Sequence, residues 1–93
     1  MAEQLDDDAI VQGLDGSLWE REGDGIVRDW TFADFREALA WVNRIGEVAE
    51  AANHHPDIQI HGWNKVRLTL LTHSAGGVTQ ADLDMARRID DAA

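Results

Sequence analysis

The stretch TFADFREALAWVNRIGEVAEAAN, residues 31–53, decides how the rest of the chain folds. Its apolar residues recur every three or four positions, which predicts a long helix with one apolar side. These residues are Phe32, Phe35, Leu39, Val42, Ile45, Ala49 and Ala52. Thr31 is the predicted N-terminal cap. Because Pro56 disfavours helical backbone angles at the residue before it, the helix should end near Asn53 or His54, with His55 extended and the two histidines pointing in different directions.

After Pro56 the pattern changes to that of two strands, predicted at residues 58–61 and 66–73 and separated by a turn. Side chains alternate between the two faces of a strand, so one face of the second strand is apolar. That face holds Val66, Leu68 and Leu70. The other face is partly polar and holds Arg67, Thr69, Leu71 and His73. This mixed face indicates cover by a helix or by another subunit.

The two ends of the chain are predicted to add a hairpin and two further helices. A short helix is expected over residues 6–13, capped by an acidic side chain at its start. Residues 18–21 and 26–30 are predicted to form a hairpin around a turn that contains two glycines. Thr79, followed three residues later by Asp82, predicts the start of the C-terminal helix.

The predicted order of elements is α-β-β-α-β-β-α. This order is typical of an α+β fold, here a four-stranded antiparallel sheet with helices packed on one face. Residues 1–93 are expected to form a single domain, because a chain of this length buries roughly 60% of its unfolded surface. A core of that size favours oligomerisation.

The chain is acidic and contains no cysteine. Of its 93 residues, eight are Lys or Arg and 18 are Asp or Glu, which gives a formal charge of −10. The absence of cysteine excludes disulfides, thiolate nucleophiles and cysteine-ligated metals. Without clustered basic residues the chain is a poor partner for nucleic acid. No apolar stretch is long enough for a secretory signal or a membrane span, so we expect a cytoplasmic protein.

All four histidines lie between residues 54 and 73. Glu50 precedes His54 by four residues, which predicts that the two side chains share a helix face and form a hydrogen bond. The helix C-terminus and this carboxylate both favour the imidazolium form, so His54 is expected to donate a proton. His73, at the end of the second strand, has no acidic neighbour in sequence. Two histidines in unlike surroundings can divide the acid and base roles.

Each of these residues also has a purely structural interpretation. Glu50 can be a solvated helix charge, and the two adjacent histidines can be helix-end residues. Four histidines raise the question of a metal, but their spacing places no two rings on one helical face, so no metal site is predicted. We expect His61 at the surface, and Trp30 and Trp41 as packing residues.

A pattern with fixed spacings runs through the second half of the chain. Its elements are Glu50, the run His54-His55-Pro56, Trp63, His73 and Asp82. This pattern closely resembles the signature of the pterin-4a-carbinolamine dehydratases. The segments WTFADF, residues 30–35, and NKV, residues 64–66, are similar to that family as well, and the Gly-Trp pair of relatives is Leu18-Trp19 here.

The resemblance implies a small hydro-lyase that dehydrates 4a-hydroxytetrahydrobiopterin to a quinonoid dihydropterin in tetrahydropterin recycling, with no metal or other cofactor. A general acid protonates the hydroxyl on carbon 4a while a base accepts the proton of the neighbouring ring nitrogen. The resemblance implies catalytic roles for His54, His73, His55 and Glu50, with Glu50 orienting His54. It implies substrate-binding roles for His55, Pro56, Thr72, Ser74, Asp82 and Trp19.

Relatives of this kind also suggest other functions. Some act as dimerisation cofactors of a transcription factor or as assembly factors for a carbon-fixing enzyme, so the alternative is a non-catalytic binding module. A third interpretation is a pterin enzyme outside hydroxylase recycling. The three motif histidines and Glu50 favour catalysis. The resemblance further implies a homodimer or homotetramer, and an aromatic amino acid hydroxylase in the same pathway.

Overall fold

The structure, a computed structural model, describes residues 3–92 of the chain. Helices and strands follow one another in the predicted order. They are α1 (Asp7–Gly13), β1 (Glu20–Glu22), β2 (Gly25–Thr31), α2 (Phe35–Ala52), β3 (Asp57–His61), β4 (Lys65–Leu70) and α3 (Gln80–Ala92). A short 3₁₀ turn, His73–Ala75, lies between β4 and α3. None of the helices within residues 3–92 combines the length and the apolar character needed to cross a membrane.

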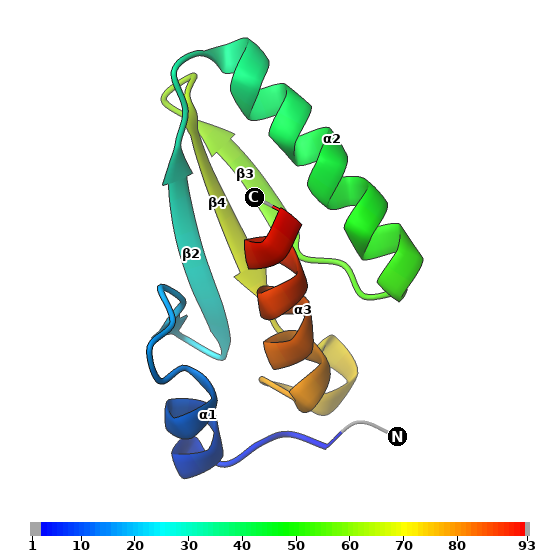
Figure 1. The fold of residues 1–93 in the computed structure, drawn as a ribbon. Helices are drawn as coiled ribbons and strands as arrows, with labels where there is room; N and C mark the ends of the chain where they lie inside the picture. Colours follow the sequence, from blue (N-terminus) through cyan, green and yellow to red (C-terminus); the bar gives the residue numbers. More distant parts are fainter. Residues whose placement is uncertain (1–2, 93) are drawn as a thin grey trace.

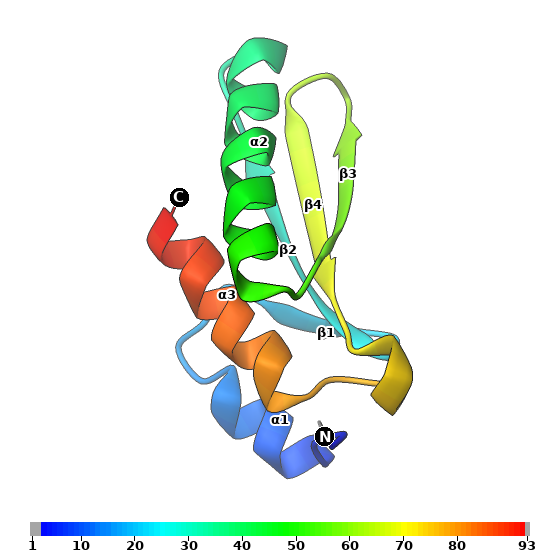
Figure 2. The same cartoon turned by 90° about the vertical axis from the view of Figure 1, so that its right-hand side faces the viewer.

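The four strands form one antiparallel sheet in the order β1-β2-β4-β3. Helices α2 and α3 pack on one face of this sheet and leave the other face open (Figures 1 and 2). Helix α1 lies beside the start of α3 (Figure 2). There Gly13 comes so close that a Cβ added to it would lie 2.4 Å from a methyl carbon of Leu83. The predicted fold class is therefore confirmed.

Helix α2 begins later than the sequence predicts. The side chain of Asp34 accepts a hydrogen bond from the backbone N–H of Glu37 at 2.8 Å and caps the helix. Thr31, the predicted cap, is the last residue of β2. That prediction is wrong because the chain stays extended through Phe32, whose N–H donates to the backbone oxygen of Asn64 at 2.8 Å.

The buried side of α2 also differs from the predicted one at two residues. The side chains that face the core are Ala38, Trp41, Ile45 and Ala49. Phe35 and Leu39, which the periodicity assigns to the buried side, are 49% and 40% exposed. The other predicted residues are buried or pack against the core, so the prediction is wrong only at Phe35 and Leu39.

The core is built around three tryptophans. Trp19 is 2% exposed and meets Trp30 edge to face, with ring centroids 5.8 Å apart. The rings of Trp30 and Trp41 lie 4.5 Å apart, and Phe32 packs on Trp41 at 5.3 Å. These contacts join β2 to α2 through aromatic area, which dominates the energetics of small cores. The predicted packing roles of Trp30 and Trp41 are confirmed.

Two strand ends differ from the prediction. β1 is short and begins at Glu20, so Leu18 lies outside the sheet and is 69% exposed. β4 ends at Leu70, three residues before His73. The chain turns there because Thr72 pairs back with Gly77 in an isolated bridge. His73 therefore begins the 3₁₀ turn and does not end a strand.

The open face of the sheet carries charges. Arg67 on β4 donates to both carboxylate oxygens of Asp29 on β2, at 2.8 and 3.0 Å, and also contacts Glu22. These hydrogen bonds from Arg67 hold the pKa of the Asp29 carboxyl below its ordinary value of 3.8, against a smaller opposing effect of burial. A helix does not cover this face, as both α2 and α3 lie on the other one. Cover by another subunit stays a prediction.

Candidate active site

The end of α2 sends the two adjacent histidines in different directions, as predicted. Asn53 adopts the left-handed conformation, with φ 51° and ψ 39°, and ends the helix. Asparagine tolerates this conformation better than most residues with a side chain. The N–H of His54 then donates to the backbone oxygen of Ala49 at 3.2 Å, while His55 continues toward Pro56.

His54 is held by Asp82, at the start of α3. Nε2 of His54 lies 2.6 Å from Oδ1 of Asp82. Because an ionised carboxylate only accepts hydrogen bonds, Nε2 carries a proton and donates it. Asp82 is wholly buried, whereas the His54 side chain is 20% exposed. The other ring nitrogen of His54, Nδ1, forms no hydrogen bond with the residues that the structure describes.

Asp82 is itself held in place by hydrogen bonds to its second oxygen. The backbone N–H of Thr79 donates to Oδ2 at 2.8 Å, and the hydroxyl of Thr72 donates to it at 2.9 Å. The hydroxyl of Thr79 lies 2.8 Å from that of Thr72 and donates to it, since the Thr72 proton is already used. A buried carboxylate needs such donors to offset its lost hydration. The predicted cap formed by Thr79 and Asp82 is confirmed.

Glu50 pairs with His55, not with His54 as the spacing predicts. Oε2 of Glu50 contacts Nε2 of His55, and both side chains are exposed, at 76% and 55%. The rule for residues four apart applies within a helix. α2 ends at Ala52, so His54 lies beyond the regular helical geometry and turns toward α3.

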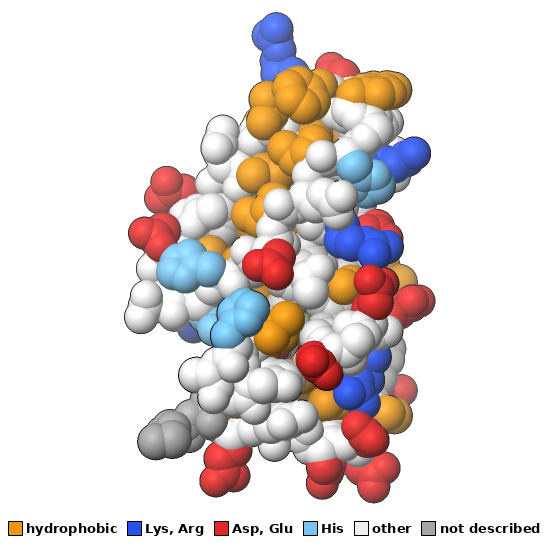
Figure 3. Space-filling model, turned by 180° about the vertical axis from the view of Figure 1, so that it is seen from behind, with side chains coloured by type: hydrophobic (Ala, Val, Ile, Leu, Met, Phe, Trp, Pro, Cys, Tyr) orange, Lys and Arg blue, Asp and Glu red, His pale blue; other side chains and the backbone are white. Residues whose placement is uncertain are grey.

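His54, His55 and His73 line one hollow of about 290 Å³. Its other lining residues are Asn53, Leu71, Thr72 and Ser74. In the space-filling view of the rear face, histidine side chains lie next to each other near one edge, and another lies apart near the opposite edge (Figure 3). The hollow is of the size that a small flat molecule requires. The structure thus brings together His54 from the end of α2 and His73 from the 3₁₀ turn.

Several predicted binding residues lie elsewhere. Trp19 is buried in the core, where its Nε1 donates to Oδ1 of Asp90 at 2.9 Å, so it does not line the hollow. Pro56 is half-buried and is not a lining residue either. Asp82 has no exposed surface and can act on a bound molecule only through its partners His54 and Thr72, which line the hollow. Trp63 is 62% exposed, in the turn between β3 and β4.

Sequence reasoning missed the link between His54 and Asp82. The helix-capping pattern of Thr79 and Asp82 is visible in the sequence, but it shows only one oxygen of the carboxylate in use. The other carboxylate oxygen of Asp82 also needs a hydrogen-bond donor when it is buried, and this requirement indicates a partner from another part of the chain. Within residues 3–92, no group of three or more His, Asp or Glu side chains is arranged to hold a metal ion.

Comparisons with known proteins identify the family to which this chain belongs. The family model described as pterin 4 alpha carbinolamine dehydratase matches residues 3–92. A protein of Thermomicrobium roseum, provisionally named pterin-4-alpha-carbinolamine dehydratase, is 49% identical over 94% of this chain and 95% of its own. A protein of Natronomonas pharaonis with the same provisional name is 43% identical over 100% of this chain and 99% of its own.

Two solved structures have the same fold. A transcriptional coactivator/pterin dehydratase of Brucella melitensis matches with a TM-score of 0.88 and 31% identity, over 98% of this chain and 99% of its own. A pterin dehydratase-like protein described as a RuBisCO assembly factor in the alpha-carboxysome matches with a TM-score of 0.66 over 80% of this chain and 87% of its own. At 22% identity it shows the fold alone. From the family match over residues 3–92 and the full-length relatives, the chain belongs to the pterin 4 alpha carbinolamine dehydratase family.

Proposed function

We propose that this chain dehydrates a 4a-hydroxytetrahydropterin, such as 4a-hydroxytetrahydrobiopterin, to the quinonoid dihydropterin. The observation that carries the proposal is the hollow lined by His54, His55 and His73, with His54 fixed by a buried carboxylate. Membership of the family supports the substrate class. The reaction releases one water molecule and needs one proton donor and one proton acceptor.

In the proposed mechanism His54 and His73 form the acid/base pair. His54 donates a proton from Nδ1 to the hydroxyl on carbon 4a, and the carbon–oxygen bond breaks as water leaves. His73 accepts the proton of the neighbouring ring nitrogen, whose electron pair forms the new double bond to carbon 4a. Each histidine returns to its starting state by exchanging one proton with solvent, so the cycle is balanced.

Asp82 is a positioning residue in this proposal. Its hydrogen bond to Nε2 fixes the tautomer of the neutral His54 ring, so that Nδ1 is the nitrogen that changes its proton. Thr72 links the same carboxylate to the segment that carries His73. One hydrogen-bonded carboxylate thus contacts both His54 and the residue next to His73.

His55 is the proposed substrate-binding histidine, with Glu50 orienting its ring. Thr72 and Ser74 line the hollow and supply polar groups for the edge of a pterin ring. We further propose that the product serves tetrahydropterin recycling in the cytoplasm, where an aromatic amino acid hydroxylase forms the carbinolamine. No cofactor takes part in the proposed mechanism.

The test is a stopped-flow dehydration assay with freshly generated carbinolamine. His54→Ala and His73→Ala should each lower turnover by roughly 10²- to 10⁴-fold, the usual contribution of a general acid or base. His61→Ala is the matched control, because His61 is an exposed histidine at the end of β3, outside the hollow. Turnover at the wild-type rate in both test variants would remove the mechanism.

A binding module is the second candidate, because the Brucella melitensis neighbour carries a description with both functions. A dimerisation cofactor or assembly factor does not need a working acid/base pair. Absence of turnover in the wild-type protein, together with stoichiometric capture of a protein other than a hydroxylase, would favour this candidate. Turnover that depends on His54 and His73 favours the enzyme.

Self-association as a homodimer or homotetramer is part of the proposal. Large apolar side chains are exposed on α2 and on the β3–β4 turn, among them Phe35 (49%), Leu39 (40%) and Trp63 (62%). In the space-filling view, apolar side chains follow one another along the upper rear face (Figure 3). Apolar surface of this kind is typical of interfaces between subunits.

A further inference from the structure

A second hollow adjoins His54. It has a volume of about 310 Å³ and lies between the end of α2 and the first turns of α3. Its lining residues are Ala51, Ala52, His54, Ala81, Asp84, Met85 and Arg88. His54 is the one residue that lines both this hollow and the histidine-lined one. A ring bound in the histidine-lined hollow beside His54 therefore lies next to the second hollow, with the His54 side chain as the shared wall.

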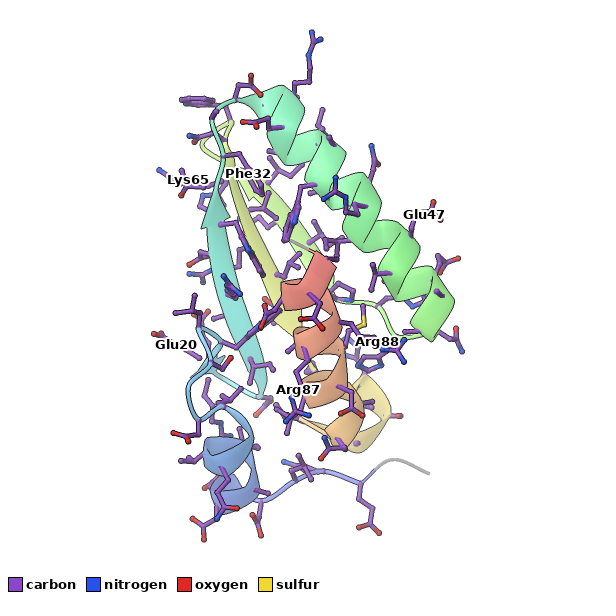
Figure 4. All side chains as sticks on the ribbon, viewed as in Figure 1. Glu20, Phe32, Glu47, Lys65, Arg87 and Arg88 are labelled. Atoms are coloured by element: carbon purple, nitrogen blue, oxygen red, sulfur yellow. The ribbon has the colours of Figure 1, made fainter. Side chains whose placement is uncertain are left out.

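The wall of the second hollow combines small and apolar side chains with one cation, one carboxylate and the His54 ring. Three alanines and the buried Met85 leave space without offering hydrogen bonds. The side chain of Arg88 lies between α3 and the end of α2, whereas that of Arg87 points toward α1 (Figure 4). Arg87 accordingly lines a separate hollow with residues of the α1–β1 loop.

The two charged side chains of the second hollow, Asp84 and Arg88, differ in whether they have partners within the protein. Asp84, its only acidic lining residue, accepts a hydrogen bond from Gln80 at 3.0 Å and lies 3.8 Å from Arg87. Arg88 forms no ion pair with the residues that the structure describes. A guanidinium with unused donors binds phosphate and carboxylate groups in a two-pronged geometry.

We propose that this second hollow binds an anionic group, a phosphate or a carboxylate, carried on the side chain of the pterin substrate, with Arg88 as the residue that selects it. The inference rests on the proposed function, because the ring must lie in the histidine-lined hollow for its side chain to reach the second hollow. In a chain with a formal charge of −10, Arg88 supplies the local attraction that an anionic substrate needs.

The test compares two carbinolamines with the same ring, one with a neutral dihydroxypropyl side chain and one with the phosphate monoester of that side chain. The wild-type protein should show a KM roughly fivefold lower for the ester, with equal kcat, which is the size expected for one partly exposed charge pair. Arg88→Gln should abolish this preference. Arg87→Gln is the matched control and should keep it.

Three results would overturn the inference while leaving the dehydratase in place. They are equal KM values for the two substrates, equal losses in the Arg87 and Arg88 variants, and inhibition by inorganic phosphate without any advantage for the ester. The last result would show that the hollow binds free phosphate and not the side chain of the substrate.

If neither carbinolamine is dehydrated, the proposed function fails, and the inference is then tested by binding alone. The stable oxidised pterins with the same two side chains are titrated, following tryptophan fluorescence. Preference for the ester that depends on Arg88 supports the inference, and equal affinity overturns it.

Discussion

Each of the two adjacent histidines contacts a different carboxylate. Asp82 is buried and holds His54, whereas Glu50 is exposed and contacts His55. A fixed, buried partner specifies one ring orientation, while an exposed pair is weakened by water and by side-chain entropy. We therefore expect substitutions at residue 82 to affect catalysis much more than substitutions at residue 50.

Asp82→Asn tests the positioning of His54. The amide can still accept the bond from Thr79 N–H with its oxygen, but its NH₂ group then faces Nε2 and favours the wrong tautomer of the ring. We expect kcat to fall by roughly 10²-fold with little change in KM.

Asp91→Asn is the control for Asp82→Asn, because Asp91 is an exposed carboxylate near the other end of α3 and lines neither hollow. Thermal unfolding followed by circular dichroism establishes that the variants are folded. A folded Asp82→Asn protein with unchanged kcat and an unchanged pH profile would contradict the positioning role.

Asp29→Asn tests the charges on the open face of the sheet. Arg67 lowers the pKa of Asp29 in the folded protein below 3.8. The ionised carboxyl therefore stabilises the folded protein at pH values above the pKa of Asp29 in the unfolded chain. This stabilisation is lost as pH falls through the pKa of Asp29 in the folded protein. The variant should be less stable than the wild type at pH 7, and the difference should shrink as pH falls below 3.8 and disappear below the lowered pKa of the folded protein. Because Asp29 is 54% exposed, the effect should be small and reduced by salt.

Urea unfolding at a series of pH values measures this difference. Asp57→Asn is the matched control, because Asp57 lies on the same open face, opposite Thr69, without an ion pair among residues 3–92. Equal pH dependence of the two variants would show that the contact between Arg67 and Asp29 adds nothing.

At the scale of elements, sequence periodicity predicts the helices and strands well but not their ends. The long helix and the two strands after Pro56 follow from the spacing of apolar residues, whereas α1 and the β1–β2 hairpin follow from a cap residue and a turn with two glycines. The start of α2 depends on hydrogen bonds between Phe32 and Asn64, which are far apart in the sequence. The partner of His54 depends likewise on α3 packing near the end of α2, which local rules cannot predict.

Asn53 is the residue whose conformation sets the end of α2. Asn53→Ala should lower the free energy of unfolding by about 1 kcal/mol, because a Cβ without a polar group is strained at positive φ. Asn53→Gly should be as stable as the wild type, since glycine adopts this conformation freely. Urea unfolding measures both, and equal stability of the two variants would contradict the argument.

At the scale of the whole molecule, apolar side chains on α2 are exposed to solvent, and we expect a second copy of the chain to cover them. Leu39→Glu should weaken self-association in sedimentation velocity experiments, because a charge at an apolar interface must be desolvated. Val11→Glu is the matched control, since Val11 on α1 is 64% exposed and lies on another helix. A wild-type protein that sediments as a monomer at all concentrations would contradict the proposed oligomer.

The sequence predicts the architecture and the three histidines of the hollow, whereas it misassigns Trp19 and the partner of Glu50. The histidines can be identified as site residues because they occur at fixed spacings in a longer pattern. Trp19 has no such spacing, and only its residue type, an aromatic side chain, suggests a role. Whether an aromatic residue lies in a core or in a cleft depends on the elements that pack around it. Trp19 contacts Trp30 on the neighbouring strand β2, and also Asp90 near the end of α3, which is 71 residues away in the sequence.

The carboxylate of residue 82 serves folding and chemistry at once. It accepts the N–H that begins α3 and also holds the His54 ring. A descendant of this protein that gave up catalysis would still be under selection to keep that aspartate, because losing it would fray the helix. Retention of an aspartate here, taken by itself, is therefore poor evidence of enzymatic activity, and the histidine of the 3₁₀ turn is the better marker.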